Sequence, residues 1–113
     1  MSSIFTKIIN KEIQSEIIFE DNLSIAFKDT NPVAPIHILI IPKKEIKTIN
    51  DINSKDKELL GHLIVVAKRI AKKLKIEQEG YRLVFNCNKN AGQTVFHIHM
   101  HLLGGRKFNW PPG

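Results

Sequence analysis

Three of the five histidines in the chain, His97, His99 and His101, occupy alternate positions in the segment QTVFHIHMHLLGG. Successive side chains on a β-strand point to opposite faces, so the three imidazoles are expected to share one face at intervals of roughly 6–7 Å. The apolar residues around them are expected to form the core face of the same strand: Phe96, Ile98, Met100 and Leu102. Three imidazoles in a row could bind a metal ion or perform acid–base and nucleophilic chemistry.

Three interpretations of this cluster compete. A solvated strand face is the plainest, but such faces usually carry Ser, Thr, Lys or Glu. A zinc site is chemically natural, because two histidines at i and i+2 can share one ion, but the three have no acidic residue near them in sequence. Catalysis on an anionic substrate is the third, since neutral imidazole is a competent nucleophile near neutral pH and a neighbouring imidazolium can stabilise phosphate charge or supply a proton.

The residues that precede the histidines favour catalysis on an anion. The segment NCNKNAGQT supplies Asn86, Gln93 and Thr94 as amide and hydroxyl donors, and Gly92 lets the backbone approach a ligand closely. Such a turn can cradle a phosphate. Taken alone, it is more simply an ordinary connection between two strands.

The elements that must position these residues can be read from apolar periodicity and turn signals. A short amphipathic helix is expected over 4–9, with Ser2 or Ser3 as its N-cap, and one long helix over about 54–76. The expected strands are 15–21, 23–29, 36–42, 81–86 and 95–103, with 36–42 in the interior of the sheet. This order indicates an α+β fold with a mainly antiparallel sheet.

Length and composition limit the class of protein. The 113 residues, 42% hydrophobic and 25% charged, fit a single domain over 1–113. One cysteine, Cys87, permits no internal disulfide, which favours a cytoplasmic location. Lys7 and Lys11 interrupt any signal-like run, and no apolar run is long enough to span a bilayer. The net charge of +6 is attributed to lysines on the outer face of the long helix, so neither nucleic acid nor membrane is expected as a partner.

Read as a whole, the sequence resembles the histidine triad (HIT) family, and within it the nucleotide-binding branch of purine nucleoside phosphoramidate hydrolases. The family signature His-x-His-x-His followed by apolar residues is present as HIHMHLL. The resemblance extends along nearly the whole chain, through IFTKIINKEI, IIFED, AFKDTNPVAPIHILIIPKK, LLGHL, GYRLVFN, GQTVFHIHMHLLGGR and WPPG.

The resemblance implies a HIT-like fold, with a five-stranded sheet, one long and one short helix, and a homodimer that extends the sheet to ten strands. It implies that His99 is the nucleophile, that His101 contacts the phosphate oxygens, and that His97 orients His99. His37 would complete the cluster, and Thr94 could relay a proton to the leaving group.

The same resemblance implies a purine nucleotide site that needs no metal or cofactor. Asp29 would bind the ribose hydroxyls, and Trp110 would lie near the partner subunit's site. The base pocket would be lined by Ile4, Phe5, Ile8, Ile13 and Phe27. The phosphate and leaving group would be surrounded by Asn86, Gly92, Gln93 and Thr94.

The implied activity is hydrolysis of the P–N bond of purine nucleoside 5′-phosphoramidates through a covalent nucleotidyl-histidine. Two alternatives remain open, a nucleotide-binding regulatory module with little turnover and a dinucleoside polyphosphate hydrolase. The chain departs from the common pattern at Gln14, Thr30, Glu45 and Thr94, which stand where proline, an aliphatic residue, histidine and serine are common. None of these changes touches the histidines, so they bear on substrate preference.

Overall fold

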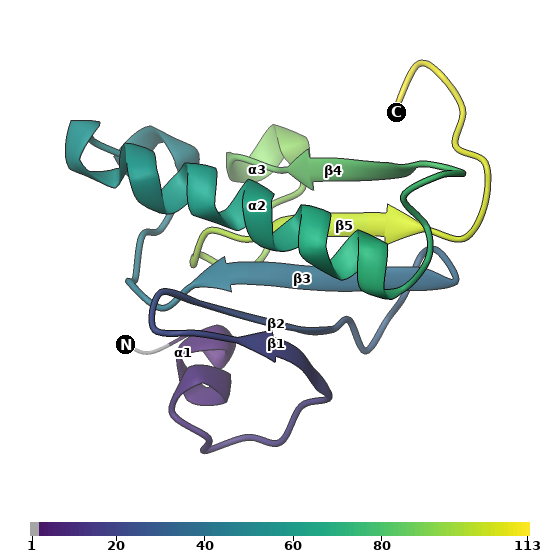
Figure 1. Cartoon of the computed structure of the whole chain (residues 1–113). Helices are drawn as coiled ribbons and strands as arrows, with labels where there is room; N and C mark the ends of the chain where they lie inside the picture. Colours follow the sequence, from purple (N-terminus) through teal and green to yellow (C-terminus); the bar gives the residue numbers. More distant parts are fainter. Residues whose placement is uncertain (1–2) are drawn as a thin grey trace.

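The computed structural model describes residues 3–113, which form one antiparallel sheet flanked by helices (Figure 1). The sheet has the order β1-β2-β3-β5-β4, and all neighbouring strands are antiparallel. The strands are β1 (Ile17–Glu20), β2 (Ser24–Lys28), β3 (Ile36–Pro42), β4 (Tyr81–Phe85) and β5 (Met100–Gly104). The helices are α1 (Ile4–Ile9), α2 (Lys57–Lys73) and α3 (Asn88–Ala91), with 3₁₀ turns at Ile49–Asp51 and Ser54–Asp56.

The two faces of the sheet are covered by different helices. Helix α2 runs across one face (Figure 1) and contributes Leu63, Val66 and Ile70 to the larger apolar cluster. Helix α1 contributes Phe5 and Ile8 to a second cluster with residues of β2 and β3. Strand β3 is therefore apolar at every position except His37, and β2 is apolar at Ile25, Ala26 and Phe27, because both strands are covered on both faces.

The ends of the helices have local causes. Ser3 caps α1, its hydroxyl accepting a hydrogen bond from the Thr6 backbone N–H at 3.1 Å, and the alternative cap Ser2 lies outside the described residues. The long helix is shorter than the expected 54–76, because its first turn is a 3₁₀ turn capped by Asn53. It ends before Lys75, whose φ of 61° is incompatible with a continuing right-handed helix.

The histidine segment is not the continuous strand expected over 95–103. Strand β5 begins only at Met100, and residues 95–99 form an irregular bend. The Ile98 N–H donates to the Ile46 carbonyl at 2.7 Å, so the chain before Met100 is held by the 46–48 segment rather than by the sheet. Phe96 is 46% exposed and does not lie on a core face. The expected alternation holds only for Ile98, Met100 and Leu102, which are buried.

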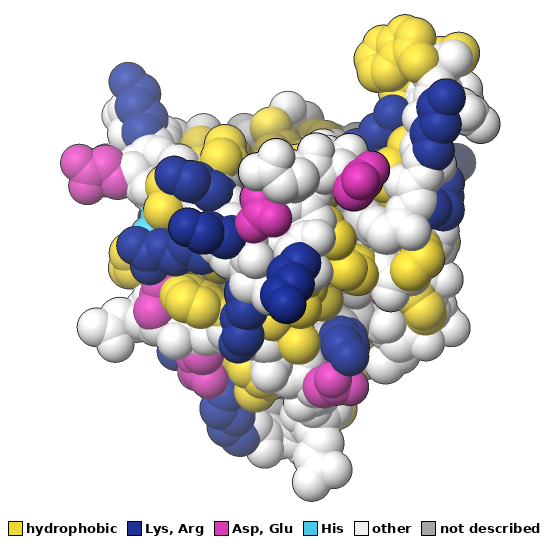
Figure 2. All heavy atoms as spheres, turned by 45° about the vertical axis from the view of Figure 1, so that its right-hand side comes forward, with side chains coloured by type: hydrophobic (Ala, Val, Ile, Leu, Met, Phe, Trp, Pro, Cys, Tyr) yellow, Lys and Arg dark blue, Asp and Glu magenta, His cyan; other side chains and the backbone are white. Residues whose placement is uncertain are grey.

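The distribution of basic side chains and the hydrophobicity of the helices complete the description of the fold. On the face shown in Figure 2, Lys and Arg side chains are dispersed among hydrophobic and acidic ones and do not form one continuous stripe. Among the described residues, no helix has the length and hydrophobicity needed to cross a membrane.

Candidate active site

Four histidines meet where β3 and β5 lie side by side. His37 is near the start of β3 and pairs with Leu103 of β5. His101 lies two residues before Leu103, so the two histidines are diagonal neighbours on the same face of the sheet. The ring centroids of His37 and His101 are 5.1 Å apart, as are those of His99 and His101. His99 and His97 come from the bend before β5. The histidines are therefore brought together mainly by the bend before β5, which carries His97 and His99, and not by the alternation of side chains along a strand.

The protonation of His99 follows from its backbone partner. Its Nδ1 lies 2.8 Å from the carbonyl oxygen of His97. A carbonyl can only accept, so Nδ1 carries the proton, and in a neutral ring Nε2 then holds a free lone pair. Burial lowers the pKa of His99, which is 8% exposed and packs edge-on against the Phe5 ring. The ring is therefore a neutral base at pH 7.

The protonation of His37 and His101 is fixed by a second chain of hydrogen bonds. The Val33 N–H donates to His37 Nδ1 at 3.1 Å, so the proton of neutral His37 is on Nε2. That Nε2–H lies 2.8 Å from His101 Nδ1 and 3.3 Å from an Asp29 carboxylate oxygen. His101 must accept at Nδ1, which leaves its Nε2 protonated and able to donate.

The pKa shifts of His37 and His101 also favour neutral rings in this series of hydrogen bonds. Burial lowers the pKa of His37, partly opposed by the Asp29 carboxylate. Burial, followed by the neighbouring His99 and His37, lowers the pKa of His101 to about 4. Crowded imidazoles in an apolar setting cannot all be charged, and here they share protons through hydrogen bonds instead.

His97 is the deepest member of the cluster and is fully buried. Its Nε2–H donates to the Pro42 carbonyl at 2.7 Å, and burial lowers its pKa. Its Nδ1 has no hydrogen-bond partner among the described residues. His97 therefore acts on His99 through its backbone carbonyl, while its side chain anchors the bend to the end of β3.

A cavity of about 490 Å³ opens beside these histidines. Its apolar lining includes all the residues expected for a base pocket: Ile4, Phe5, Ile8, Ile13 and Phe27. Its polar lining includes Asp29, Thr94, His37, His99 and His101. The volume falls within the range of small-molecule sites.

Several expected site residues, Asn86, Gly92 and Gln93, are not among the residues that line this cavity. The expectation that Trp110 lies near the partner subunit's site stays a prediction. Gln93 is 5% exposed, and its amide nitrogen donates to the carbonyls of Lys47 and Val95 at 2.8 and 3.1 Å. Its amide oxygen accepts from the Asn88 N–H at 2.9 Å. Both donors of the Gln93 side chain are thus used to shape the loop.

Gly92 and Trp110 have separate settings. Gly92 ends α3 with a φ of 87°, a left-handed conformation that favours glycine. Trp110 is 82% exposed in the C-terminal tail.

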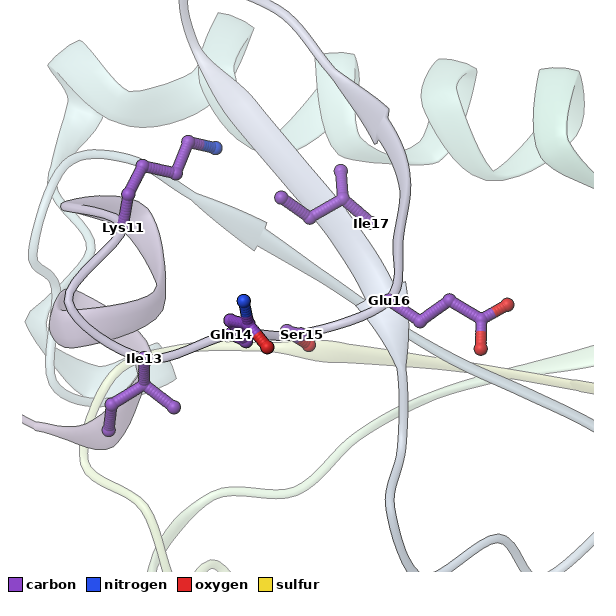
Figure 3. A pocket seen from close by; sticks show the side chains of 6 residues that line it. All are labelled: Lys11, Ile13, Gln14, Ser15, Glu16 and Ile17. Atoms are coloured by element: carbon purple, nitrogen blue, oxygen red, sulfur yellow. The ribbon is translucent and has the colours of Figure 1, made fainter.

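The cavity also has lining residues that the sequence did not assign. Asn31 lies on its wall and donates its backbone N–H to Asp29 Oδ1 at 2.8 Å, which orients the carboxylate. Gln14 and Ser15 also line the cavity and belong to an adjoining open hollow as well (Figure 3). Gln14 is one of the positions at which the sequence departs from the common family pattern.

One set of groups could coordinate a metal ion. Ligand atoms of Asp29, His37 and His101 all lie within 4.8 Å of one another. His37 and His101 use two of these atoms in their mutual hydrogen bond at 2.8 Å, so an ion would have to replace that bond.

Comparison with known proteins places this fold and site in one family. The family model of the HIT domain matches residues 10–108, so the chain belongs to the HIT domain family and is a HIT-family hydrolase. The resemblance inferred from the sequence is thereby confirmed.

Relatives of this chain match it over most of their length. A purine nucleoside phosphoramidase from Escherichia coli (strain K12) is 52% identical over 104 residues, covering 92% of this chain and 87% of that protein. An uncharacterized HIT-like protein from Synechocystis is 51% identical, covering 98% of this chain and 96% of the other. The crystal structure of a HIT family hydrolase from Legionella pneumophila has 52% identity and a TM-score of 0.97, covering 99% of this chain and 100% of that one.

Proposed function

We propose that the protein hydrolyses the P–N bond of purine nucleoside 5′-phosphoramidates through a covalent nucleotidyl-His99 intermediate. The observation that carries this proposal is the hydrogen bond from His99 Nδ1 to the His97 carbonyl, which leaves the Nε2 lone pair free beside the cavity. The name of the relative from Escherichia coli, purine nucleoside phosphoramidase, supports the same substrate class.

In this proposal the substrate contacts both the apolar and the polar lining of the cavity. The purine lies among the five apolar residues, which include Phe5 and Phe27. The Asp29 carboxylate accepts hydrogen bonds from the ribose hydroxyls. The α-phosphate then lies against His99 and His101, where the Nε2–H of His101 donates to a non-bridging oxygen. That donor is preorganised, since the His37 bond to its Nδ1 fixes the ring's tautomer.

The first chemical step is attack of His99 Nε2 on the α-phosphorus. The new N–P bond forms as the bond to the amine breaks, and the amine leaves with a proton relayed by Thr94 or a histidine. The ring becomes a phosphorylated imidazolium. Its Nδ1–H then makes a charge-assisted bond to the His97 carbonyl, which stabilises the positive charge.

The second step is hydrolysis of this intermediate. Water attacks phosphorus, the His99 N–P bond breaks, and neutral imidazole is a good leaving group. The proton lost by the water replaces the one that the amine carried away. The products are a nucleoside monophosphate and a free amine.

A substitution tests the role of His99. His99→Ala should abolish turnover of adenosine 5′-phosphoramidate and leave AMP binding largely intact. His62→Ala is a matched control, because His62 pairs with Asp21 at 2.7 Å on the α2 face and is not among the cavity residues. Substantial residual hydrolysis by His99→Ala would contradict the proposal. Tight binding of AMP by the wild type without turnover would favour a nucleotide-binding module. A preference for Ap3A or Ap4A over phosphoramidates would favour a dinucleoside polyphosphate hydrolase.

We also propose that two copies associate through the edge of the sheet formed by β4. This strand is at the edge opposite β1, so pairing of two β4 strands would give ten strands. Its Leu83 side chain is apolar and 36% exposed, and helix α2 exposes Ile64 and Val65 at 53% and 45%. Sedimentation equilibrium should give a dimer mass, and Leu83→Lys should shift it toward the monomer.

A further inference from the structure

The C-terminal end of β5 turns back onto the loop that carries part of the candidate active site. Arg106 Nη2 donates to the Val33 carbonyl at 3.1 Å, in the loop that joins β2 to β3. The contact is close, because a Cβ placed on Gly105 would lie 2.8 Å from Pro35 Cβ. The φ of 88° at Gly105 also favours glycine and directs the chain toward the loop.

The loop residue that Arg106 holds is the one that fixes the His37 ring. Val33 receives the guanidinium bond at its carbonyl and donates its own N–H to His37 Nδ1 at 3.1 Å. The two groups flank one Cα atom, so fixing the carbonyl restricts the direction of the N–H. His37 in turn donates to His101 Nδ1 at 2.8 Å.

Arg106 is itself held in place on the surface. Its guanidinium carbon lies 4.2 Å from the centroid of the Phe108 ring, and Nη1 donates to the Lys107 carbonyl at 3.0 Å. Stacking on an aromatic ring reduces the freedom of an otherwise exposed arginine. Arg82 lies over the same Phe108 ring at 5.2 Å and donates to the Asn109 carbonyl, so it holds the tail without reaching the loop.

We infer that Arg106 is a positioning residue for the reaction, which acts through Val33 to hold His37 in the Nε2–H tautomer that His101 requires. Without this bond, Val33 can rotate away from His37 Nδ1, and the long 3.3 Å contact between Asp29 and Nε2 is then the main carboxylate restraint on the tautomer. The ring can therefore take its proton on Nδ1 more often. His101 then loses its defined tautomer and, with it, the constant Nε2–H donor toward the phosphate. The effect on turnover rests on the proposed function, whereas the effect on the His37 tautomer does not.

The test compares Arg106→Ala with Arg82→Ala in the full-length protein. Long-range ¹H–¹⁵N spectra of imidazole-labelled protein report which nitrogen of His37 is protonated, and steady-state kinetics with adenosine 5′-phosphoramidate give kcat and KM. In the wild type, His37 should show a single Nε2–H tautomer. Arg106→Ala should give a mixture of tautomers and a fall in kcat of about three- to tenfold, the effect of one hydrogen bond. Arg82→Ala should leave the His37 tautomer unchanged.

The possible results separate this inference from the proposed function. If the wild type does not hydrolyse phosphoramidates, the proposed function is refuted. The measurement of the His37 tautomer still decides whether Arg106 is a positioning residue. A single His37 Nε2–H tautomer in Arg106→Ala overturns the inference, as does a tautomer mixture of equal size in Arg82→Ala. Thermal unfolding of both variants checks that the fold is intact, which the surface positions of both guanidinium groups favour.

Discussion

Acidification through the pH at which an ordinary histidine titrates should reduce turnover much less than it would with unperturbed imidazoles. The proposed mechanism requires neutral His99 as the nucleophile and neutral His101 with its Nδ1 free to accept. Burial lowers the pKa of both rings, that of His101 to about 4. An imidazole with an unperturbed pKa of about 6.5 would be neutral in roughly one molecule in ten at pH 5.5.

The expected magnitude follows from this comparison. If both rings had ordinary pKa values, each would lower kcat/KM about tenfold between pH 7.5 and 5.5, and together they would lower it about a hundredfold. Because burial lowers the pKa of both rings, the acid limb should lie below pH 6.5 and the loss should be much smaller. The cause is the setting of His99, 8% exposed and flanked by the Phe5 ring with centroids 5.0 Å apart.

The assay is kcat/KM for adenosine 5′-phosphoramidate between pH 4.5 and 8.5, by chromatography of the AMP released. This ratio reports the pKa values of the free enzyme. Blank rates are subtracted, because phosphoramidates hydrolyse in acid, and circular dichroism checks the fold at each pH. An acid limb centred at or above pH 6.5 in folded protein would refute the argument that burial keeps these rings neutral.

Three other predictions follow from the same structure. The free energy of unfolding should decrease as pH falls from about 6.5 to about 4, because His101 binds a proton at about pH 6.5 in the unfolded protein and only at about pH 4 in the native protein. The expected contribution of His101 is about 3 kcal/mol. A urea midpoint that stays constant over this pH range would contradict the prediction. Gln93→Leu should lower the free energy of unfolding by about 1–3 kcal/mol, because it leaves the Lys47 and Val95 carbonyls and the Asn88 N–H without their side-chain partner. The affinity for AMP should change little. A large loss of AMP affinity at unchanged stability would show instead that Gln93 contacts the ligand. Activity should survive exhaustive dialysis against EDTA, and a loss restored by zinc would instead favour a metal at His37 and His101.

Much of the fold could be predicted because its sequence signals are local. The apolar segment 36–42 is buried on both faces, as its lack of alternation indicated. The apolar stripe of α2 and the Ser3 cap of α1 could also be predicted from residues next to one another in the sequence. The lining of the cavity also contains most of the site residues that the family resemblance implied.

What the sequence could not predict depends on contacts between distant segments. Residues 95–99 have the alternation of a strand, but the Ile98 N–H bonds to Ile46 and the His97 ring to Pro42, which bends the chain. Gln93 has the chemistry of a phosphate ligand, yet two backbone carbonyls occupy both its donors. The bond from Arg106 to Val33 joins residues 73 positions apart, and no local pattern signals it.

The most direct test of the central claim is to trap the intermediate. Wild-type protein is mixed with adenosine 5′-phosphoramidate, quenched in base within one turnover, digested and examined by mass spectrometry. The account predicts one adenylyl group, located on the peptide that contains His99 and absent from His99→Ala. Incorporation of ¹⁸O from labelled water into AMP without any adenylylated peptide, or adenylylation at another residue, would contradict it.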